Sequence, residues 1–146
     1  MRWEIEQKID ALVADETGTI FKDAPFRVSL VYPSPYNVGM SSLGFQTIYR
    51  ILNERPDMVC ERAFLPEDPE FWRKSRTPLL TYESKRPVDE ADLVAFSVAY
   101  ECEIIGLLEC LNLAGIPFRA KDRGKGWPLV LFGGPLTNSN PLPIAP

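Results

Sequence analysis

Four short stretches in which apolar and β-branched residues dominate predict β-strands. Proline, glycine or charged residues bound each stretch, and the third is apolar almost throughout, which is typical of a parallel strand buried on both faces. The predicted strands are Phe26–Tyr32, Met58–Leu65, Leu93–Val98 and Pro128–Phe132. The segments between these strands are long enough to hold helices.

Around the strands, apolar residues recur at helical spacing, which predicts amphipathic helices. The first precedes the strands, the second is capped by Ser41 or Ser42 and ends at Pro56, and the third runs from about Glu101 to Gly115. The apolar positions are Ile5, Ile9, Leu12 and Val13 in the first helix (residues 3–14), Phe45, Ile48, Tyr49 and Leu52 in the second, and Ile104, Leu107, Leu108 and Leu111 in the third.

This alternation predicts an α/β fold with a doubly wound, mainly parallel sheet of about four or five strands between two layers of helices. We expect residues 1–25 to form an N-terminal helix and linker, and residues 26–146 to form the domain. Between 67 and 87 the pattern is mixed, with a helix over Pro69–Arg76 and an extended piece over Leu79–Glu83 as hypotheses. The proline-rich end holds no further strand, so we expect the domain to be truncated before its last strand.

In sheets of this kind, ligands bind beyond the carboxyl ends of the strands. The small and polar residues there leave room for a broad, flat ligand, or they only form turns and hydrogen bonds to the backbone. In that structural alternative Gly39 turns the chain and Gly44 packs the next helix against a strand. The candidate cofactor-binding residues are Tyr36, Asn37, Gly39, Ser97, Tyr100, Gly133 and Gly134.

The net charge of −4 argues against a general nucleic-acid surface, which needs a basic patch. No apolar run approaches the roughly 18 residues that a membrane span requires. The first residues lack the apolar block of a secretory signal. We therefore expect a cytoplasmic protein with neither a nucleic acid nor a membrane as partner.

Histidine is absent, which excludes an imidazole base, nucleophile activator or metal ligand. The three cysteines, Cys60, Cys102 and Cys110, show no metal-site spacing and are predicted to be small buried thiols. Glu61 and Glu83 are compatible with pairing to arginines. We predict no metal site and no catalytic residue in this chain.

Three other nucleotide- or phosphate-binding classes do not match the strand ends. A P-loop needs Lys and Ser or Thr where Phe45 and Gln46 follow Gly44. A receiver domain needs acidic residues where Tyr32 and Ser97 stand, and a flavodoxin phosphate loop is rich in Ser and Thr where this chain has prolines.

Two stretches of the sequence carry a resemblance to a known family. They are Val31–Gln46 with Ile48–Asn53, and Leu131–Pro135 with Asn140–Pro141. Both resemble the N-terminal cobalamin (vitamin B12)-binding-like domain of a group of bacterial radical S-adenosylmethionine (radical SAM) proteins. The similarity runs from about Phe26 to the chain end, and it implies a Rossmann-like, flavodoxin-like three-layer α/β/α fold.

Cobalamin domains of the methionine synthase and mutase kind carry D-x-H-x-x-G, S-x-L and G-G motifs at three strand ends. Residues 34–39 fall in register with the first motif, with Ser34 replacing the aspartate and Tyr36 replacing the histidine that ligates cobalt. The second motif keeps its serine but not its leucine, and the third keeps both glycines. This register adds Ser34 and Ala99 to the candidate residues.

The resemblance implies an accessory domain that presents a cofactor or substrate face to a downstream radical SAM domain of the same chain. Cobalamin is compatible with it only without a histidine ligand, as in some cobalamin-dependent radical SAM enzymes. The [4Fe–4S] cluster and S-adenosylmethionine belong to the downstream region, since the cysteines here do not form the C-x-x-x-C-x-x-C loop. The alternative is a degenerate cobalamin-type fold without cofactor, used for docking or as part of a homo-oligomer. On either reading the fragment alone is not expected to be catalytic.

Overall fold

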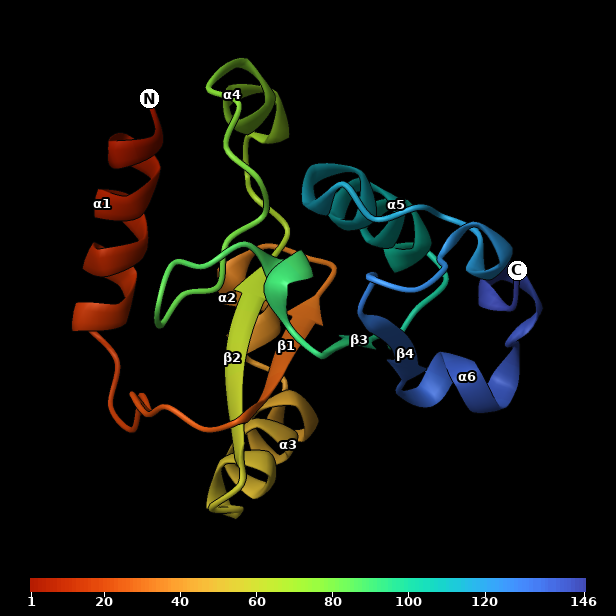
Figure 1. The fold of residues 1–146 in the computed structure, drawn as a ribbon, viewed down its shortest axis with the longest axis horizontal. Helices are drawn as coiled ribbons and strands as arrows, with labels where there is room; N and C mark the ends of the chain where they lie inside the picture. The colour runs from red at the N-terminus through yellow and green to blue at the C-terminus, as the bar shows by residue number, and fades with distance from the viewer.

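In the computed structural model, which describes all residues from 1 to 146, strands and helices alternate as the sequence predicts (Figure 1). The strands are β1 Phe26–Tyr32, β2 Met58–Phe64, β3 Leu93–Ser97 and β4 Leu129–Gly133. The helices are α1 Arg2–Ala14, α2 Tyr36–Met40, α3 Leu43–Glu54, α4 Pro69–Lys74, α5 Glu103–Ala114 and α6 Pro135–Ser139. Short 3-10 turns occupy Val88–Glu90, Ala120–Asp122 and Leu142–Ile144.

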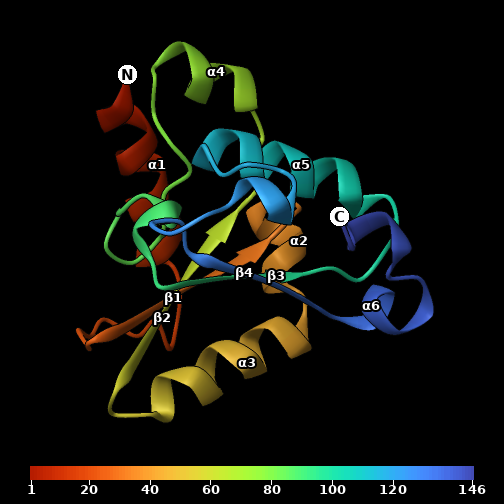
Figure 2. The same ribbon diagram turned by 45° about the vertical axis from the view of Figure 1, so that its right-hand side comes forward.

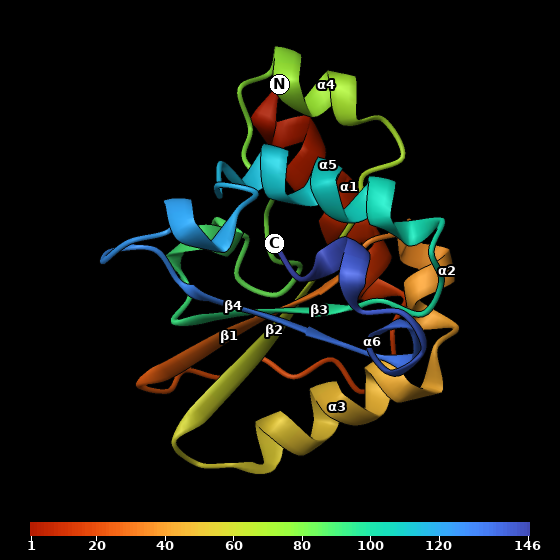
Figure 3. The same cartoon turned by 90° about the vertical axis from the view of Figure 1, so that its right-hand side faces the viewer.

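The four strands form one parallel sheet in the order β2-β1-β3-β4. Helix α3 lies along one face of this sheet and α5 along the other (Figures 2 and 3). The fold is therefore a Rossmann-like, flavodoxin-like α/β fold, which confirms the predicted fold class. The chain order reverses between β1 and β3, so this pair is the topological switch point of the sheet.

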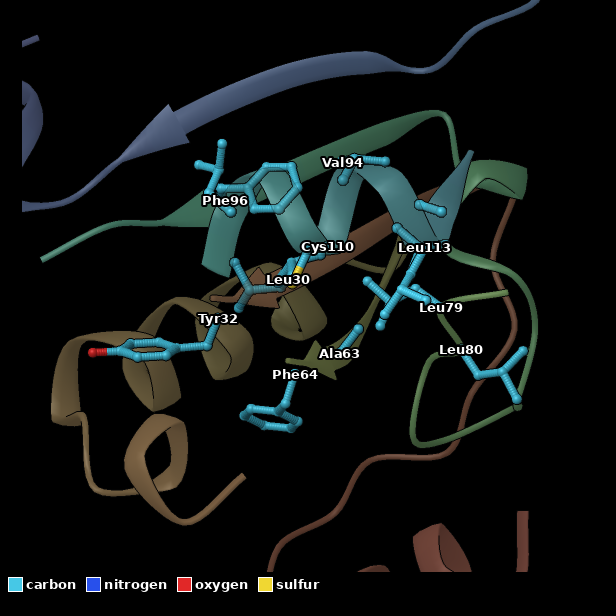
Figure 4. Packing of buried hydrophobic residues seen from close by; sticks show 14 of the residues in the cluster. Leu30, Tyr32, Ala63, Phe64, Leu79, Leu80, Val94, Phe96, Cys110 and Leu113 are labelled. Atoms are coloured by element: carbon cyan, nitrogen blue, oxygen red, sulfur yellow. The ribbon is translucent and has the colours of Figure 1, made fainter. Parts of the chain in front are cut away.

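The core lies between the sheet and its helices and is built from side chains that alternate between the two faces. Tyr32 and Phe64 are register partners, and Phe45 of α3 packs edge-on against Tyr32. On the other face Val94 and Phe96 of β3 lie near α5 (Figure 4). The short apolar runs of the sequence thus become strands because they supply apolar side chains to both layers.

Helix ends follow the predicted signals in part. Ser42 caps α3 by accepting a hydrogen bond from Phe45 N–H, and Gly115 ends α5 in the left-handed conformation. The loop predicted after β1 instead contains the short helix α2, in which Val38 and Gly39 N–H donate to the Pro35 carbonyl.

Strand β2 lies at one edge of the sheet, and its outer backbone groups are bonded. The Asn53 amide donates to the Cys60 carbonyl at 2.9 Å and accepts from Cys60 N–H at 2.9 Å. Farther along, Arg62 N–H donates to the Glu83 carboxylate at 2.8 Å, and Tyr82 N–H donates to the Arg62 carbonyl at 2.7 Å. These outward-facing N–H and C=O groups of β2 therefore have hydrogen-bond partners without a further strand.

Helix α1 packs onto this side of the molecule through Ile5 and Ile9, which are buried in the same apolar cluster as the sheet residues. The linker after α1 is held by Glu16, whose carboxylate accepts hydrogen bonds from the Arg62 guanidinium at 2.8 and 3.1 Å. The predicted boundary at residues 25 and 26 falls immediately before β1. No helix combines the length and the apolar content needed to cross a membrane.

Candidate functional site

The candidate residues lie around the carboxyl ends of the strands, and they divide into two groups. Tyr36, Asn37 and Gly39 belong to α2, which follows β1 and packs toward β2. Ser97 and Gly133 are register partners across β3 and β4. The first group is the set in α2, and the second group consists of the remaining predicted residues, Ser34, Ser97, Ala99, Tyr100, Gly133 and Gly134.

Three members of the second group are connected through Glu103, the first residue of α5. Its buried carboxylate accepts hydrogen bonds from Ser34 Oγ at 3.0 Å, Ala99 N–H at 2.8 Å and Tyr100 N–H at 3.1 Å. These bonds join the loop after β1 to the loop after β3, across the switch point of the sheet. This role of Glu103 was not predicted from the sequence, because nothing local distinguishes it from an acidic residue that only favours the helix dipole.

Tyr36 lies on the other side of β1, toward β2, and its side chain is hydrogen-bonded within the chain. Its hydroxyl donates to Glu16 at 2.5 Å, and its ring stacks on Tyr82 with centroids 5.6 Å apart. Burial, followed by the bond to Glu16, raises the pKa of Tyr36 above its ordinary value. The phenol is therefore neutral near pH 7 and acts as a hydrogen-bond donor.

The same cluster contains a buried arginine between two carboxylates. Arg62, whose side chain is 2% exposed, contacts Glu16 at 2.8 Å and Glu83 at 2.6 Å, and its guanidinium lies over the Tyr49 ring at 4.6 Å. Burial raises the pKa of Glu83 despite the bonds from Arg62. Burial also acts to raise the pKa of Glu16, but hydrogen bonds from its neighbours outweigh it and lower that pKa.

The pairing of Glu83 with an arginine agrees with the sequence analysis, and so does the pairing of Glu61, whose carboxylate lies 3.1 Å from the Arg27 guanidinium. Arg62 itself was missed as a network centre. Its partner Glu16 lies far away in sequence. An arginine within an apolar strand indicates that carboxylate partners are needed if it is buried, but the sequence does not show which residues these are.

Two glycines in the helices at this end of the sheet, Gly39 and Gly106, have close neighbours. A Cβ on Gly39 would lie 2.5 Å from the Phe64 ring, and one on Gly106 would lie 2.2 Å from the Pro33 carbonyl oxygen. Gly44 is exposed and has no such contact, so the structural alternative is wrong for both residues: Gly39 lies within α2 and packs it on the sheet, and Gly44 does not pack a helix on a strand. These glycines bring helices close to the strand ends.

Gly133 and Gly134 differ although they are adjacent. Gly134 has φ +114°, and a Cβ there would lie 2.4 Å from the Val98 carbonyl oxygen. A Cβ on Gly133 would have no atom within 4 Å. Gly134 is therefore required by the backbone, whereas Gly133 borders open space.

The open space at Gly133 continues along an uncovered part of the sheet, which we call the open face. Its β4 residues are Leu129, Leu131 and Gly133, which alternate onto one side of the strand, and the two leucines are 69% and 53% exposed. This is the side on which α3 covers β1 and β2. Ile48 and Ile51 of α3, 44% and 51% exposed, lie on the helix flank opposite the one that faces the linker.

The thiols are arranged partly as predicted. Cys60 and Cys110 are buried, but Cys102 is exposed at the residue that precedes α5, where its side chain forms no cap hydrogen bond. Burial raises the pKa of the Cys60 and Cys110 thiols. No three His, Cys, Asp or Glu side chains lie together in an arrangement that could hold a metal ion.

Comparison with known proteins gives one match. Residues 44–146, more than half of the chain, match the family described as "Radical SAM proteins, N-terminal". The matched part includes β2, β3, β4 and α5, and it leaves out α1, β1 and α2. No curated protein and no solved structure matches the chain.

Proposed function

Because the chain belongs to the family of radical SAM protein N-terminal domains, we propose that it is an accessory domain that docks on the radical SAM catalytic domain of the same protein through its open face. The [4Fe–4S] cluster and S-adenosylmethionine are held by that catalytic domain. This domain then presents one end of its sheet to the reaction and takes no chemical step itself.

The observation that carries the proposal is the exposure of Leu129 and Leu131 on β4. A central sheet normally has helices on both faces, and a contiguous apolar surface on a soluble domain marks an interaction site. Ile48 and Ile51 of α3, the helix that packs on the same face of the sheet, are exposed apolar side chains as well. An apolar surface of this kind fits the core of a protein–protein interface.

The catalytic domain is the occupant that the family membership supports. Ser97 and Gly133, two of the candidate residues, lie at the carboxyl end of the open face. A domain docked there would meet the strand ends at which α/β sheets hold ligands. Docking would therefore place a cofactor or substrate between the two domains.

Cobalamin bound through a protein ligand to cobalt does not fit these residues. Tyr36, which stands where the ligating histidine is expected, has its hydroxyl bonded to Glu16. Ser34, which stands where the orienting aspartate is expected, is bonded to Glu103. Cobalamin held without such a ligand is a second candidate, which the open space at Gly133 favours. A titration with hydroxocobalamin tests it: a saturable change in the visible spectrum supports it, and none refutes it.

Binding between this chain and the separately purified catalytic domain of its parent protein tests the main proposal. We expect Leu131→Glu to weaken binding by about 10- to 100-fold, because a buried leucine contributes about 1.5–3 kcal/mol. Leu108→Glu is the matched control, since Leu108 is 41% exposed on α5, which packs on the other face of the sheet. Equal affinities of the two variants, measured by calorimetry, would refute docking through the open face.

Self-association through β4 is the competing proposal. β4 pairs on one side only, so its other side can pair with a second copy. Sedimentation equilibrium distinguishes the two uses: a dimer of this chain that Leu131→Glu dissociates favours the homo-oligomer, and a monomer favours docking on the catalytic domain.

A further inference from the structure

A cavity lies between α1 and the segment that follows β2, on the side of the molecule away from β4. Its volume is about 420 Å³, which is within the range of small-molecule sites. Figure 1 shows α1 standing beside the loop that leads to α4. We propose that this cavity binds a small apolar or aromatic molecule that carries a positive charge.

The interior of the cavity is apolar and aromatic. Ile5 and Ile9 of α1 line it from one side, and Trp72 and Tyr82 line it from the other; all four are buried. Tyr36, stacked on Tyr82, closes the end near the sheet. Such walls favour a flat or hydrocarbon ligand, and aromatic faces also attract cations.

Acidic side chains dominate the rim. Asp15, Glu67 and Asp68 line the cavity and are exposed, against the single lysine Lys8. The Asp68 carboxylate is already used, because it accepts the Phe71 N–H at the start of α4. Lys8 lies over the Phe71 ring at 5.4 Å, and neither Asp15 nor Glu67 forms an ion pair. The uncompensated charge at the rim is therefore negative and selects a cation.

The cavity walls are held in place by ion pairs outside it. Glu16 ties the linker after α1 to Arg62, and Lys85 pairs with Asp10 on the outer side of the helix. A site whose walls are already fixed loses little conformational entropy when a ligand enters. The α1 wall and Tyr36 lie outside the residues that match the family, whereas the opposite wall, with Trp72 and Tyr82, lies within them.

Calorimetric titration with two aromatic probes of equal size tests the proposal. The probes are 2-naphthylmethylamine, a cation at neutral pH, and 2-naphthoate, an anion. We expect saturable one-to-one binding of the amine, and at least about tenfold weaker binding of the naphthoate. Absence of saturable amine binding, or naphthoate binding as tight as that of the amine, would overturn the proposal.

Two variants locate the binding. Ala11→Phe adds a ring at an exposed wall position, so we expect it to abolish amine binding while the circular dichroism spectrum is unchanged. Glu67→Lys reverses a rim charge and should weaken amine binding by about fivefold or more. Glu54→Lys makes the same change at an exposed position on α3 outside the cavity. If Glu67→Lys and Glu54→Lys have equal effects, the charge at the rim does not select the ligand and the proposal fails.

Discussion

Gly134 and Gly133 offer a matched pair in which the same substitution has opposite expected consequences. Gly134→Ala places a methyl group 2.4 Å from the Val98 carbonyl oxygen, a backbone atom that also accepts a hydrogen bond from Leu136 N–H at 3.3 Å, so relief of the overlap requires the backbone to shift. The backbone at Gly134, with φ 114° and ψ 177°, is also nearly restricted to glycine. Gly133→Ala meets no atom within 4 Å.

The magnitude follows from these two contributions. A residue forced into this backbone region costs about 1–3 kcal/mol, and a steric overlap in a packed site costs about 1–3 kcal/mol. We therefore expect Gly134→Ala to lower the free energy of unfolding by about 2–6 kcal/mol, a large share of the roughly 5–15 kcal/mol typical of a domain. Gly133→Ala should change it by less than about 1 kcal/mol.

Urea unfolding followed by tryptophan fluorescence measures both values. With a urea slope of about 1–3 kcal/mol per molar, the midpoint of Gly134→Ala should fall by about 1–3 M, while that of Gly133→Ala stays near the wild-type midpoint. If the two variants unfold at the same urea concentration, the close approach of Gly134 to Val98 has no energetic effect and the prediction is wrong.

Three further predictions concern the edge strand, the buried acid cluster and the thiols. Asn53→Ala leaves the buried Cys60 N–H without its partner, so it should lower the free energy of unfolding by about 1–3 kcal/mol in urea; an unchanged midpoint would contradict the edge role of Asn53. Since the pKa of Glu16 is lowered on folding, its stabilisation is present above the ordinary value of 4.5 and is lost as the pH falls through the folded value. Glu16→Gln should therefore be less stable than the wild type at pH 7, and its stability should fall less steeply than that of the wild type as the pH drops below 4.5. Thermal unfolding at several pH values measures both, and wild-type and variant curves that run parallel would show that protonation of Glu16 is not coupled to folding. One thiol, Cys102, should react with Ellman's reagent in the native protein and three in urea, because Cys60 and Cys110 are buried; more than one fast native thiol would contradict this packing.

The sequence pattern predicted the order of strands and helices because each apolar run alternates with a run of helical spacing. Local signals also predicted a helix end at Gly115 and a cap at Ser41 or Ser42, of which the structure uses Ser42. The structure differs from the prediction where tertiary contacts determine the local conformation. Helix α2, in a loop that contains prolines and glycine, exists because Gly39 can approach Phe64 closely, which no local pattern shows.

The candidate site was predicted at the carboxyl ends of the strands from a general rule about parallel sheets, and the residues named there do lie near those ends. The connections among them were not predictable. Glu103 joins Ser34 to the loop after β3 across 69 residues of sequence, and Arg62 reaches Glu16 across 46. Side-chain pairs at such separations leave no periodic signal, and their geometry comes only from the folded chain.

The two edges of the sheet have different consequences for how this domain can assemble. Asn53 and Glu83 bond the outer backbone groups of β2, whereas no strand of residues 1–146 pairs with the outer side of β4. A sheet that is open at both margins can join copies end to end into an unlimited fibre. With the β2 margin closed, pairing of two copies through β4 would leave no open margin, so this geometry would allow a dimer but no fibre.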